Sequence, residues 1–473
     1  MTRGEPDRPV RRLERAAHAN MERSSGQVMR LVAVTLAAAV IVAFSALAGS
    51  TGEREETIAL SPMQRLGKAV FSDPELSFNR NQSCAQCHAP AAGFSGPDSE
   101  INAGGAVYEG SILGRFGNVK PPTASYVTPA PVLYHTMEDG KPLFVGGLFF
   151  NGRATGKKLG NAAADQAQHP FLDPKEMALP DTACVVYRVC NPKDPGSYPV
   201  KPSDIWGGEF CRIDWPKNRD IDADCSKLDE PLELEKEPRE KAAAAFDRIA
   251  RSIAAYLASP EVSPYSSKFD FYLAGKAKLS AQEQLGMEVF MGKGLCGDCH
   301  IMEPGPNGEP PLLTDFTYDN LGGPRNGENP FYGQKAFNPE GRNWVDIGLG
   351  GPLAEDLFYK SAAAAQQGKQ KVPTLRNVDK RPAPGFVKSY THNGYFKTLK
   401  GVVNFYNTRD TKPACPDPLT SEAQALAQNC WPEAEVKQNV NKDELGNLKL
   451  TEAEEQALVA FMRTLSDGYQ PEE

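Results

Sequence analysis

The sequence predicts a mainly α-helical protein in which two similar units stand in tandem, joined and extended by long loops. Three observations lead to this fold class. The pattern Cys-x-x-Cys-His occurs once in each half of the chain, at residues 84–88 and 296–300. A short amphipathic segment ending in phenylalanine precedes each copy. The 473 residues include 42 glycines and 39 prolines, which favours loops over a bundle of long helices.

The spacing of apolar residues places the helices. Residues 66–71 and 286–290 are the two short amphipathic helices that precede the repeated pattern. Between residues 240 and 257, apolar side chains recur at helical spacing. Residues 451–465 show the same periodicity, and Thr451 with the acidic residues after it supplies an N-cap. Residues 181–235, which contain four cysteines, are expected to form an insertion of irregular structure.

Charge and composition exclude two classes of protein. The chain has 52 Lys and Arg against 60 Asp and Glu, a formal net charge of −8. No basic excess is available to displace phosphate counterions, so we expect no nucleic-acid partner. Hydrophobic residues at 40% and aromatic residues at 9% are too many for a disordered chain. At about 150 residues per domain, the length predicts two to three domains.

Residues 1–50 are predicted to be a signal peptide or an N-terminal membrane anchor. Residues 31–48 are uncharged and apolar, and they end in Ala-Leu-Ala, the small-x-small pattern that signal peptidase recognises. The run is also just long enough to span a bilayer, so an uncleaved anchor is the alternative. Either segment places the folded part outside the cytoplasm. We therefore expect a periplasmic protein that contacts a membrane only through such an anchor.

Each Cys-x-x-Cys-His pattern has the spacing that attaches haem covalently. The two thiols add to the vinyl groups of the haem, and the adjacent histidine gives an imidazole to the iron. The residues are Cys84, Cys87 and His88 in the first copy, and Cys296, Cys299 and His300 in the second. A zinc site is a poor alternative, because zinc needs four tetrahedral ligands and the copies lie in different halves of the chain. Two copies in an exported chain predict two covalently bound haem c groups.

The six other cysteines are expected to form disulfides, as is common in an oxidising compartment. We predict the pairs Cys184–Cys190, Cys211–Cys225 and Cys415–Cys430, because each closes a short loop rich in Pro or Asp.

The sequence resembles the bacterial di-haem cytochrome c peroxidases and their MauG-type relatives over roughly residues 60–180 and 240–465. The matching pieces are Leu66-Gly67-Lys68, Leu76-Ser77, Gly152-Arg153-Ala154, Asp315-Phe316, Asn320-Leu321-Gly322, Gly348-Leu349-Gly350, residues 371–377, His392-Asn393-Gly394, Lys397-Thr398-Leu399 and residues 402–407. The resemblance implies two tandem cytochrome c-like haem domains with long loops and a Cys-containing insertion. These would be a peroxidatic domain at 58–262, with the insertion at 181–235, and an electron-transfer domain at 263–473.

The resemblance also implies a peroxide pocket over the first haem. The family has a Gln, a Pro four residues later and a Glu six residues beyond that, and Gln166, Pro170 and Glu176 have this spacing. A carboxylate there can take a proton from peroxide and return it to the leaving oxygen. Proline fills space without offering a donor or an iron ligand. His169 is interpreted as a residue at the pocket rim, with iron ligation as the alternative.

Tyr406 stands where the family carries the sixth ligand of the second haem. By the resemblance, conventional peroxidases have Met at this position and MauG-type enzymes have Tyr. A phenolate favours oxidised iron, whereas a thioether raises the reduction potential. A core aromatic on a helix is the alternative for Tyr406.

Three positions depart from the family pattern. Phe150 replaces the Trp that lies between the haems, and it is harder to oxidise. Lys120 replaces an Asn at the calcium site of relatives, so its ammonium is expected to replace the ion. Asn118 is a weak substitute ligand, and calcium stays open as a cofactor. The distal-loop His of conventional peroxidases has no counterpart between His88 and Lys120, which argues for an open site.

These features predict a periplasmic di-haem c-type peroxidase that reduces hydrogen peroxide with electrons from a small c-type cytochrome or cupredoxin. MauG-like oxidation of aromatic residues on a partner protein is the alternative within the family. Tyr406 favours that alternative and Phe150 weakens it. A non-enzymatic di-haem electron-transfer cytochrome is the alternative outside the family, and its signature would be His169 bound to the first iron.

Overall fold

The computed structural model describes residues 59–138, 140–305 and 308–471, which belong to one compact unit. The expected signal peptide or anchor at residues 1–50 lies outside this part of the chain. Among the described residues, no helix is both long enough and apolar enough to cross a membrane.

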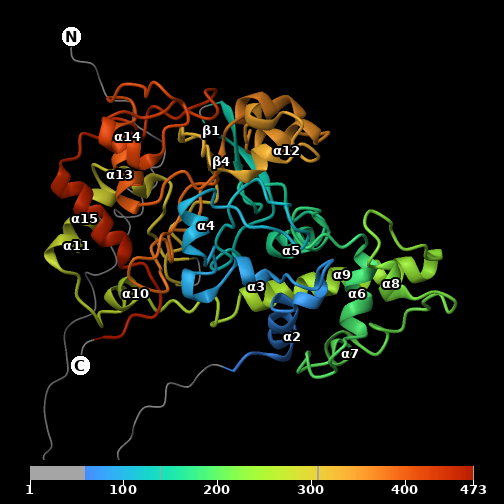
Figure 1. Ribbon diagram of the computed structural model, residues 1–473. Helices are drawn as coiled ribbons and strands as arrows, with labels where there is room; N and C mark the ends of the chain where they lie inside the picture. The colour runs from blue at the N-terminus through green and yellow to red at the C-terminus, as the bar shows by residue number, and fades with distance from the viewer. Residues whose placement is uncertain (1–58, 139, 306–307, 472–473) are drawn as a thin grey trace, which may run out of the picture. The chain divides into compact units, whose positions relative to one another are not determined.

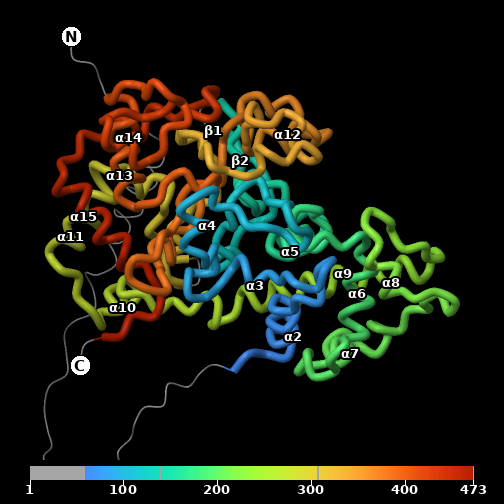
Figure 2. Tube along the Cα trace, viewed as in Figure 1, coloured from blue at the N-terminus to red at the C-terminus, as the bar shows by residue number. Residues whose placement is uncertain are grey.

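Short helices joined by long loops make up most of the described chain (Figures 1 and 2). Up to residue 273, the elements are α2 (Pro62–Phe71), η1 (Pro74–Leu76), α3 (Cys84–Cys87), η2 (Pro90–Ala92), α4 (Ser99–Ala103), β1 (Tyr134–Glu138), β2 (Lys141–Val145), α5 (Ala162–Leu172), α6 (Thr182–Cys190), α7 (Pro202–Trp206), α8 (Ile221–Asp224), α9 (Lys236–Leu257) and α10 (Lys268–Leu273).

The remaining elements include more single-turn helices. They are α11 (Ala281–Met291), η3 (Cys296–Asp298), β3 (Tyr318–Asp319), η4 (Pro330–Gly333), η5 (Gly341–Asn343), α12 (Gly350–Glu355), η6 (Lys360–Gln366), β4 (Gln370–Lys371), α13 (Leu399–Thr408), α14 (Glu422–Gln428) and α15 (Glu452–Arg463). The strands form two small antiparallel pairs, β1 with β2 and β3 with β4. The mainly helical fold is therefore confirmed, and helices cover all four segments where periodicity predicted them.

Two helix crossings of the same kind organise the packing. Helix α2 crosses α9, and α11 crosses α15, so each pair joins segments far apart in the sequence (Figure 1). A glycine lies at each point of contact. A Cβ atom on Gly67 would overlap the carbonyl oxygen of Ser252, and one on Gly286 would overlap that of Ala457. Only glycine allows the two backbones to approach this closely.

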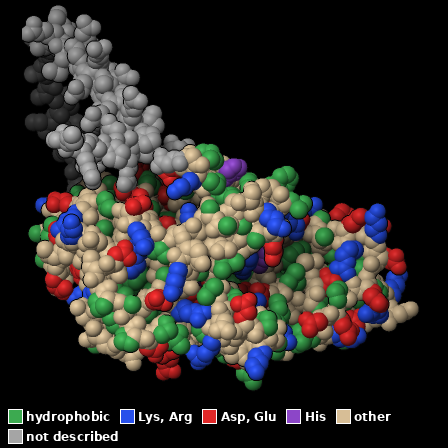
Figure 3. Space-filling model, turned by 90° about the horizontal axis from the view of Figure 1, so that it is seen from above, with side chains coloured by type: hydrophobic (Ala, Val, Ile, Leu, Met, Phe, Trp, Pro, Cys, Tyr) green, Lys and Arg blue, Asp and Glu red, His purple; other side chains and the backbone are tan. Residues whose placement is uncertain are grey.

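The buried side chains gather in two main clusters that follow these crossings. The first draws its residues from Leu66 to Val262 and includes the buried faces of α2, α5, α6 and α9. The second draws its residues from Phe269 to Leu465 and includes those of α11, α13 and α15. On the face shown in Figure 3, acidic and basic side chains are intermixed.

The disulfides differ from the prediction in two of three cases. Cys415–Cys430 is confirmed, whereas the other four cysteines pair as Cys184–Cys225 and Cys190–Cys211. Cys184 and Cys190 lie on the same helix, α6, where six residues rise about 9 Å. That separation exceeds the Cα–Cα distance of about 4.4–6.8 Å that a disulfide spans. The expected irregular structure of the insertion is also wrong for α6, which is regular, largely buried and packed against α9.

Substituting Gly67 tests the tightness of the α2–α9 crossing. We expect Gly67→Ala to lower the free energy of unfolding by roughly 1–3 kcal/mol, because the new methyl group overlaps the Ser252 backbone. Urea unfolding of the holoprotein measures this change. The matched control is Gly351→Ala on α12, where the added Cβ would make only ordinary contacts with Ile347. If both variants unfold at the wild-type urea concentration, close packing at Gly67 does not contribute to stability.

Candidate functional site

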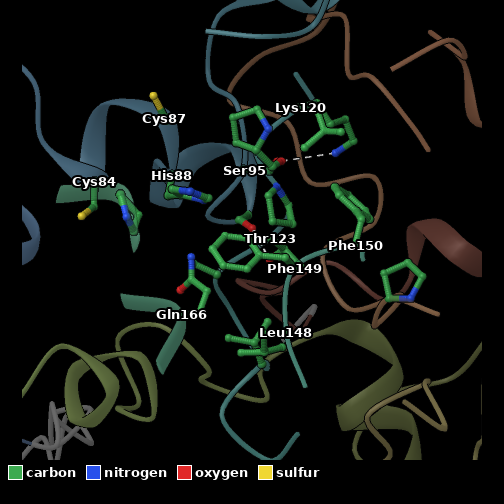
Figure 4. Close-up of a pocket in the computed structure, with 18 of the residues that line it drawn as sticks. Cys84, Cys87, His88, Ser95, Lys120, Thr123, Leu148, Phe149, Phe150 and Gln166 are labelled. Carbon is green, nitrogen blue, oxygen red and sulfur yellow. Dashed lines mark hydrogen bonds between the residues drawn. The ribbon is translucent and has the colours of Figure 1, made fainter. Parts of the chain in front are cut away.

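One cavity collects the residues expected at the first haem and at the peroxide pocket. It lies between α3, α5 and the loops that follow them, and segments from the second half of the chain close its other side. The lining includes Cys84, Cys87, His88, Gln166, Pro170 and Glu176. Figure 4 shows the first four of these around one space, together with Lys120 and Phe150. The six residues are separated by up to 92 positions in sequence, so the fold has brought them together.

The first Cys-x-x-Cys-His pattern forms α3 and its C-cap. The backbone N–H of His88 donates to the carbonyl of Cys84 over 2.9 Å, which closes the turn around both cysteines. Nδ1 of His88 lies 3.1 Å from the carbonyl oxygen of Phe94. Because a carbonyl only accepts, Nδ1 carries the proton, and Nε2 is the nitrogen that can bind iron. Both thiols are free, as attachment to haem requires.

The second pattern repeats this arrangement. The N–H of His300 donates to the carbonyl of Cys296 over 2.9 Å, and its Nδ1 lies 2.9 Å from the carbonyl oxygen of Leu313. Cys296 and Cys299 are also free thiols. The acceptor residues share an unusual backbone conformation, with φ of 54° at Phe94 and 56° at Leu313.

A Pro-Thr segment braces each acceptor residue. The hydroxyl of Thr123 donates to the carbonyl of Gly93 over 2.8 Å, and that of Thr374 donates to the carbonyl of Leu312 over 2.6 Å. Gly93 and Leu312 directly precede Phe94 and Leu313, whose carbonyls accept from the histidines. The two halves therefore orient their histidines with the same device.

The surroundings of the first pattern bear on which group its cysteines can hold. Burial raises the pKa of Cys84 and that of Cys87 to about 12, so both are neutral at pH 7. No group of three or more His, Cys, Asp or Glu that could hold a metal ion occurs in the described part of the chain. These observations do not fit a zinc site. Two thiols, one oriented imidazole and an adjoining cavity fit a covalently attached haem.

Helix α5 and the turn after it supply the predicted peroxide-pocket residues. Gln166 and Pro170 are four residues apart on α5, so they face the same side of the helix. The turn returns Glu176 to the cavity, and the N–H of Met177 donates to the carbonyl of Pro170 over 3.0 Å. Burial, with a smaller contribution from Asp173, raises the pKa of Glu176 to about 7. At neutral pH this carboxyl group can therefore both accept and return a proton.

Arg153 is a member of the site that the sequence indicated only as part of a matching motif. Its guanidinium carbon lies 3.5 Å from the centroid of the Phe149 ring, and the side chain lines the cavity. Its positive charge lowers the pKa of Glu176 and partly offsets the effect of burial. His169 is exposed, packs edge-on against Phe149 at 5.3 Å and is not part of the lining, which favours the rim interpretation.

Tyr406 lies beside the second Cys-x-x-Cys-His pattern. It is on α13 and packs against the second buried cluster together with Cys296. Burial raises its pKa, and Cys296 and Asp319 raise it further by charge repulsion. No hydrogen bond of its hydroxyl is found within the described ranges. The phenol therefore lies close to the second pattern, and its oxygen makes no hydrogen bond with any described residue.

Phe150 lines the cavity, and its ring lies near a cation and a histidine. The Lys120 ammonium is 5.9 Å from the centroid of its ring, and the imidazole of His392 is 6.3 Å away. His392 is paired with the buried Glu435 at 3.2 Å, and this carboxylate raises the pKa of His392. The backbone carbonyl of Phe150 accepts from the N–H of Lys371 over 2.7 Å.

The residues around Lys120 do not fit a calcium ion. Calcium takes six to eight oxygen ligands. Here the nearby carbonyls are already bound by ammonium groups. Nζ of Lys388 donates to the carbonyls of Ala92, Asn377 and Lys380 over 2.9, 2.9 and 3.0 Å. Nζ of Lys397 donates to those of Asn102, Gly104 and Gly394 over 2.8, 2.5 and 2.6 Å. The carbonyl of Asn118 accepts from the side chain of Asn329.

Comparison with known proteins gives a consistent result. Residues 61–278 match the family model described as di-haem cytochrome c peroxidase. The methylamine utilization protein MauG of Paracoccus denitrificans is 34% identical over 411 residues, which cover 86% of this chain and 89% of that protein. The cytochrome-c peroxidase IdrP2 of Denitromonas iodatirespirans is 25% identical over 95% of this chain and 93% of its own length.

A solved structure is similar as well. The di-haem peroxidase BthA from Burkholderia thailandensis superposes with a TM-score of 0.63 and 28% sequence identity. The match covers 86% of this chain and 87% of BthA.

Replacing Tyr406 tests whether it ligates the second iron. We expect Tyr406→Phe to retain both haems and to change the absorption spectrum of one of them, because only one iron loses an axial oxygen. Tyr395→Phe is a matched control, since its buried hydroxyl donates to the Thr420 carbonyl over 3.0 Å. A Tyr406→Phe spectrum identical to the wild type would make Tyr406 a packing residue.

Proposed function

Because the chain belongs to the di-haem cytochrome c peroxidase family, which includes MauG, we propose that it is a periplasmic di-haem c-type peroxidase. It reduces hydrogen peroxide with electrons from a small redox protein such as cytochrome c. The observation that carries the proposal is the convergence of a haem-attachment pattern and of Gln166, Pro170 and Glu176 on one cavity. Residues 58–262 form the peroxidatic domain in this proposal, and residues 263–473 form the electron-transfer domain.

Both haems are bound covalently in this proposal. Cys84 and Cys87 would attach the first, and His88 would bind its iron. Cys296 and Cys299 would attach the second, and His300 and Tyr406 would bind its iron. When bound, the first haem supplies the iron at which peroxide is reduced, and the second supplies an electron store. The imidazole–carbonyl bonds to Phe94 and Leu313 support these assignments, because they fix each ring with Nε2 available.

Glu176 moves the proton. Its carboxylate accepts a proton from peroxide and returns it to the departing oxygen, and a pKa of about 7 allows both steps near neutral pH. Arg153 supplies a nearby positive charge that favours the ionised carboxylate. Gln166 offers an amide donor, and Pro170 fills the wall without an N–H that would compete for the substrate.

Tyr406 favours a second candidate function, the peroxide-dependent oxidation of aromatic residues on a partner protein. A phenolate ligand stabilises oxidised iron, which suits an enzyme that holds oxidising equivalents for transfer to a protein. The methylamine utilization protein MauG matches over most of this chain. Phe150, in contrast, is harder to oxidise than a tryptophan and makes transfer through that ring less favourable. A pure electron-transfer cytochrome is disfavoured, because His169 is exposed and lies off the cavity.

Three disulfides support a periplasmic location. Disulfides persist in oxidising compartments and are rare in the cytosol, and the structure pairs Cys184 with Cys225, Cys190 with Cys211 and Cys415 with Cys430. Export through the segment at residues 1–50 accords with this.

Glu176→Gln tests the role of the carboxyl group. The variant should retain both haems and lose roughly 10²-fold or more in the rate of its reaction with peroxide, because the amide cannot accept the proton. Stopped-flow spectroscopy of the holoprotein measures the rate. The control is Glu340→Gln, an exposed glutamate outside the cavity, which should react as the wild type does. Unchanged kinetics for Glu176→Gln would remove Glu176 from the mechanism.

The pH dependence gives a separate test of the same group. A base acts in its ionised form, so the peroxide rate should rise as pH increases through about 7, the pKa of Glu176. In Glu176→Gln this rise should be absent. A wild-type rate that is flat between pH 5 and 9, to within about twofold, would show that no group with this pKa controls the reaction.

A further inference from the structure

The cavity is strongly positive. Among the described residues that line it, one side chain is acidic, Glu176, and six are cationic: Lys120, Arg153, Lys175, Lys371, Arg376 and Lys388. A buried charge is costly unless it is paired or bound by several hydrogen bonds. The cavity is therefore built for a ligand that brings negative charge.

Three of the six cations are already satisfied by the protein. Lys175 pairs with Asp173 at 2.7 Å. Arg376 forms a two-pronged ion pair with Asp270, at 2.9 and 3.0 Å. The ammonium of Lys388 donates to three backbone carbonyls. Because these three groups already have partners within the protein, they are poor candidates for binding a charged ligand.

Lys120 is different. Its only hydrogen bond within the described ranges is to the carbonyl of Pro121, at 3.4 Å, and no carboxylate there lies within 4 Å. The side chain faces the cavity beside Phe150 (Figure 4). Burial, and then the positive charge of Lys397, lower the pKa of Lys120 to about 8. Within residues 59–138, 140–305 and 308–471, no carboxylate forms an ion pair with this ammonium.

The same position in the second half of the chain also holds a lysine. Lys120 and Lys371 each stand two residues before a Pro-Thr pair, and that pair braces the acceptor of the haem-motif histidine in both halves. Nζ of Lys371 donates to the carbonyls of Gly146 and Phe316 over 3.2 and 3.3 Å, and it too has no carboxylate within 4 Å among the described residues. Both lysines line the cavity beside the first haem-attachment pattern.

We propose that the ammonium of Lys120 is the counter-cation of a propionate carboxylate of the first haem, and that this fixed charge makes the protein independent of calcium. The proposal rests on the proposed function, since it requires a haem attached at Cys84 and Cys87. Haem carries two carboxylates, and Lys120 is a half-buried cation, with no carboxylate partner among the described residues, on the wall of the cavity that would hold it. A dication placed near Lys120, Lys388 and Lys397 would be repelled by three ammonium groups.

The experiment uses the holoprotein and begins with its haem content. Two covalent haems in the wild type establish the premise, whereas haem missing from the first motif would refute the proposed function. Potentiometric titration of Lys120→Met should then show a lower midpoint potential for one haem, because loss of a nearby positive charge stabilises the ferric form. Lys120→Arg keeps the charge and should restore the wild-type potential.

The control variant is Lys157→Met. The ammonium of Lys157 also lies over an aromatic ring, 4.5 Å from the centroid of Tyr359, but it does not line the cavity. Its potentials should equal those of the wild type. Unchanged potentials in Lys120→Met would overturn the proposal, because an ammonium paired with a haem carboxylate must influence that haem.

The claim of calcium independence is tested on the wild-type holoprotein, so the result does not depend on whether a variant folds. We expect less than 0.1 equivalent of bound calcium by elemental analysis, and no change in spectrum or midpoint potentials after treatment with a chelator or after addition of calcium. One equivalent of calcium whose removal alters either haem would overturn the claim of independence.

Discussion

The hydrogen bond from the imidazole of each motif histidine to a backbone carbonyl is the contact around which both sites are arranged. It fixes the tautomer, and so decides which nitrogen faces the iron. The acceptors, Phe94 and Leu313, hold a left-handed backbone conformation that few bulky residues adopt, and the hydroxyls of Thr123 and Thr374 brace the residues before them. The same local structure thus orients the histidine of both Cys-x-x-Cys-His patterns, while the surroundings of the two patterns differ.

The two sites differ in the side chains that lie near each Cys-x-x-Cys-His pattern. Over the first, α5 and its turn place Gln166, Pro170 and Glu176, and burial brings the carboxyl pKa close to neutrality. At the second, α13 places the phenol of Tyr406 beside the attachment cysteines. The first arrangement leaves room for a small substrate and a proton acceptor. The second offers a hard oxygen ligand.

The sequence predicted the parts of this account that depend on local spacing, and it failed where distant segments meet. Cys-x-x-Cys-His brings its cysteines and histidine together through local spacing alone, and the periodicities of α9 and α15 predicted these helices to within a few residues. The pairing of Cys184 failed because α6 carries Cys190 too far along the helix axis, which no loop-length argument reveals. Arg153 and the unpaired ammonium of Lys120 acquire meaning only from the cavity they share. Whether a charged side chain has a partner depends on the tertiary structure.

The central claim is that the cavity beside His88 is where peroxide reacts. Mixing the fully oxidised holoprotein with one equivalent of hydrogen peroxide, with no reductant present, tests it most directly through rapid visible and near-infrared spectra. We predict that peroxide changes the spectrum of the protein, either at once or after one haem has been reduced. An immediate change that leaves a long-lived oxidised state would favour the MauG-like candidate. A reaction only after one haem has been reduced would keep the peroxidase and exclude the MauG-like candidate. No reaction in either the oxidised or the half-reduced protein would contradict the account.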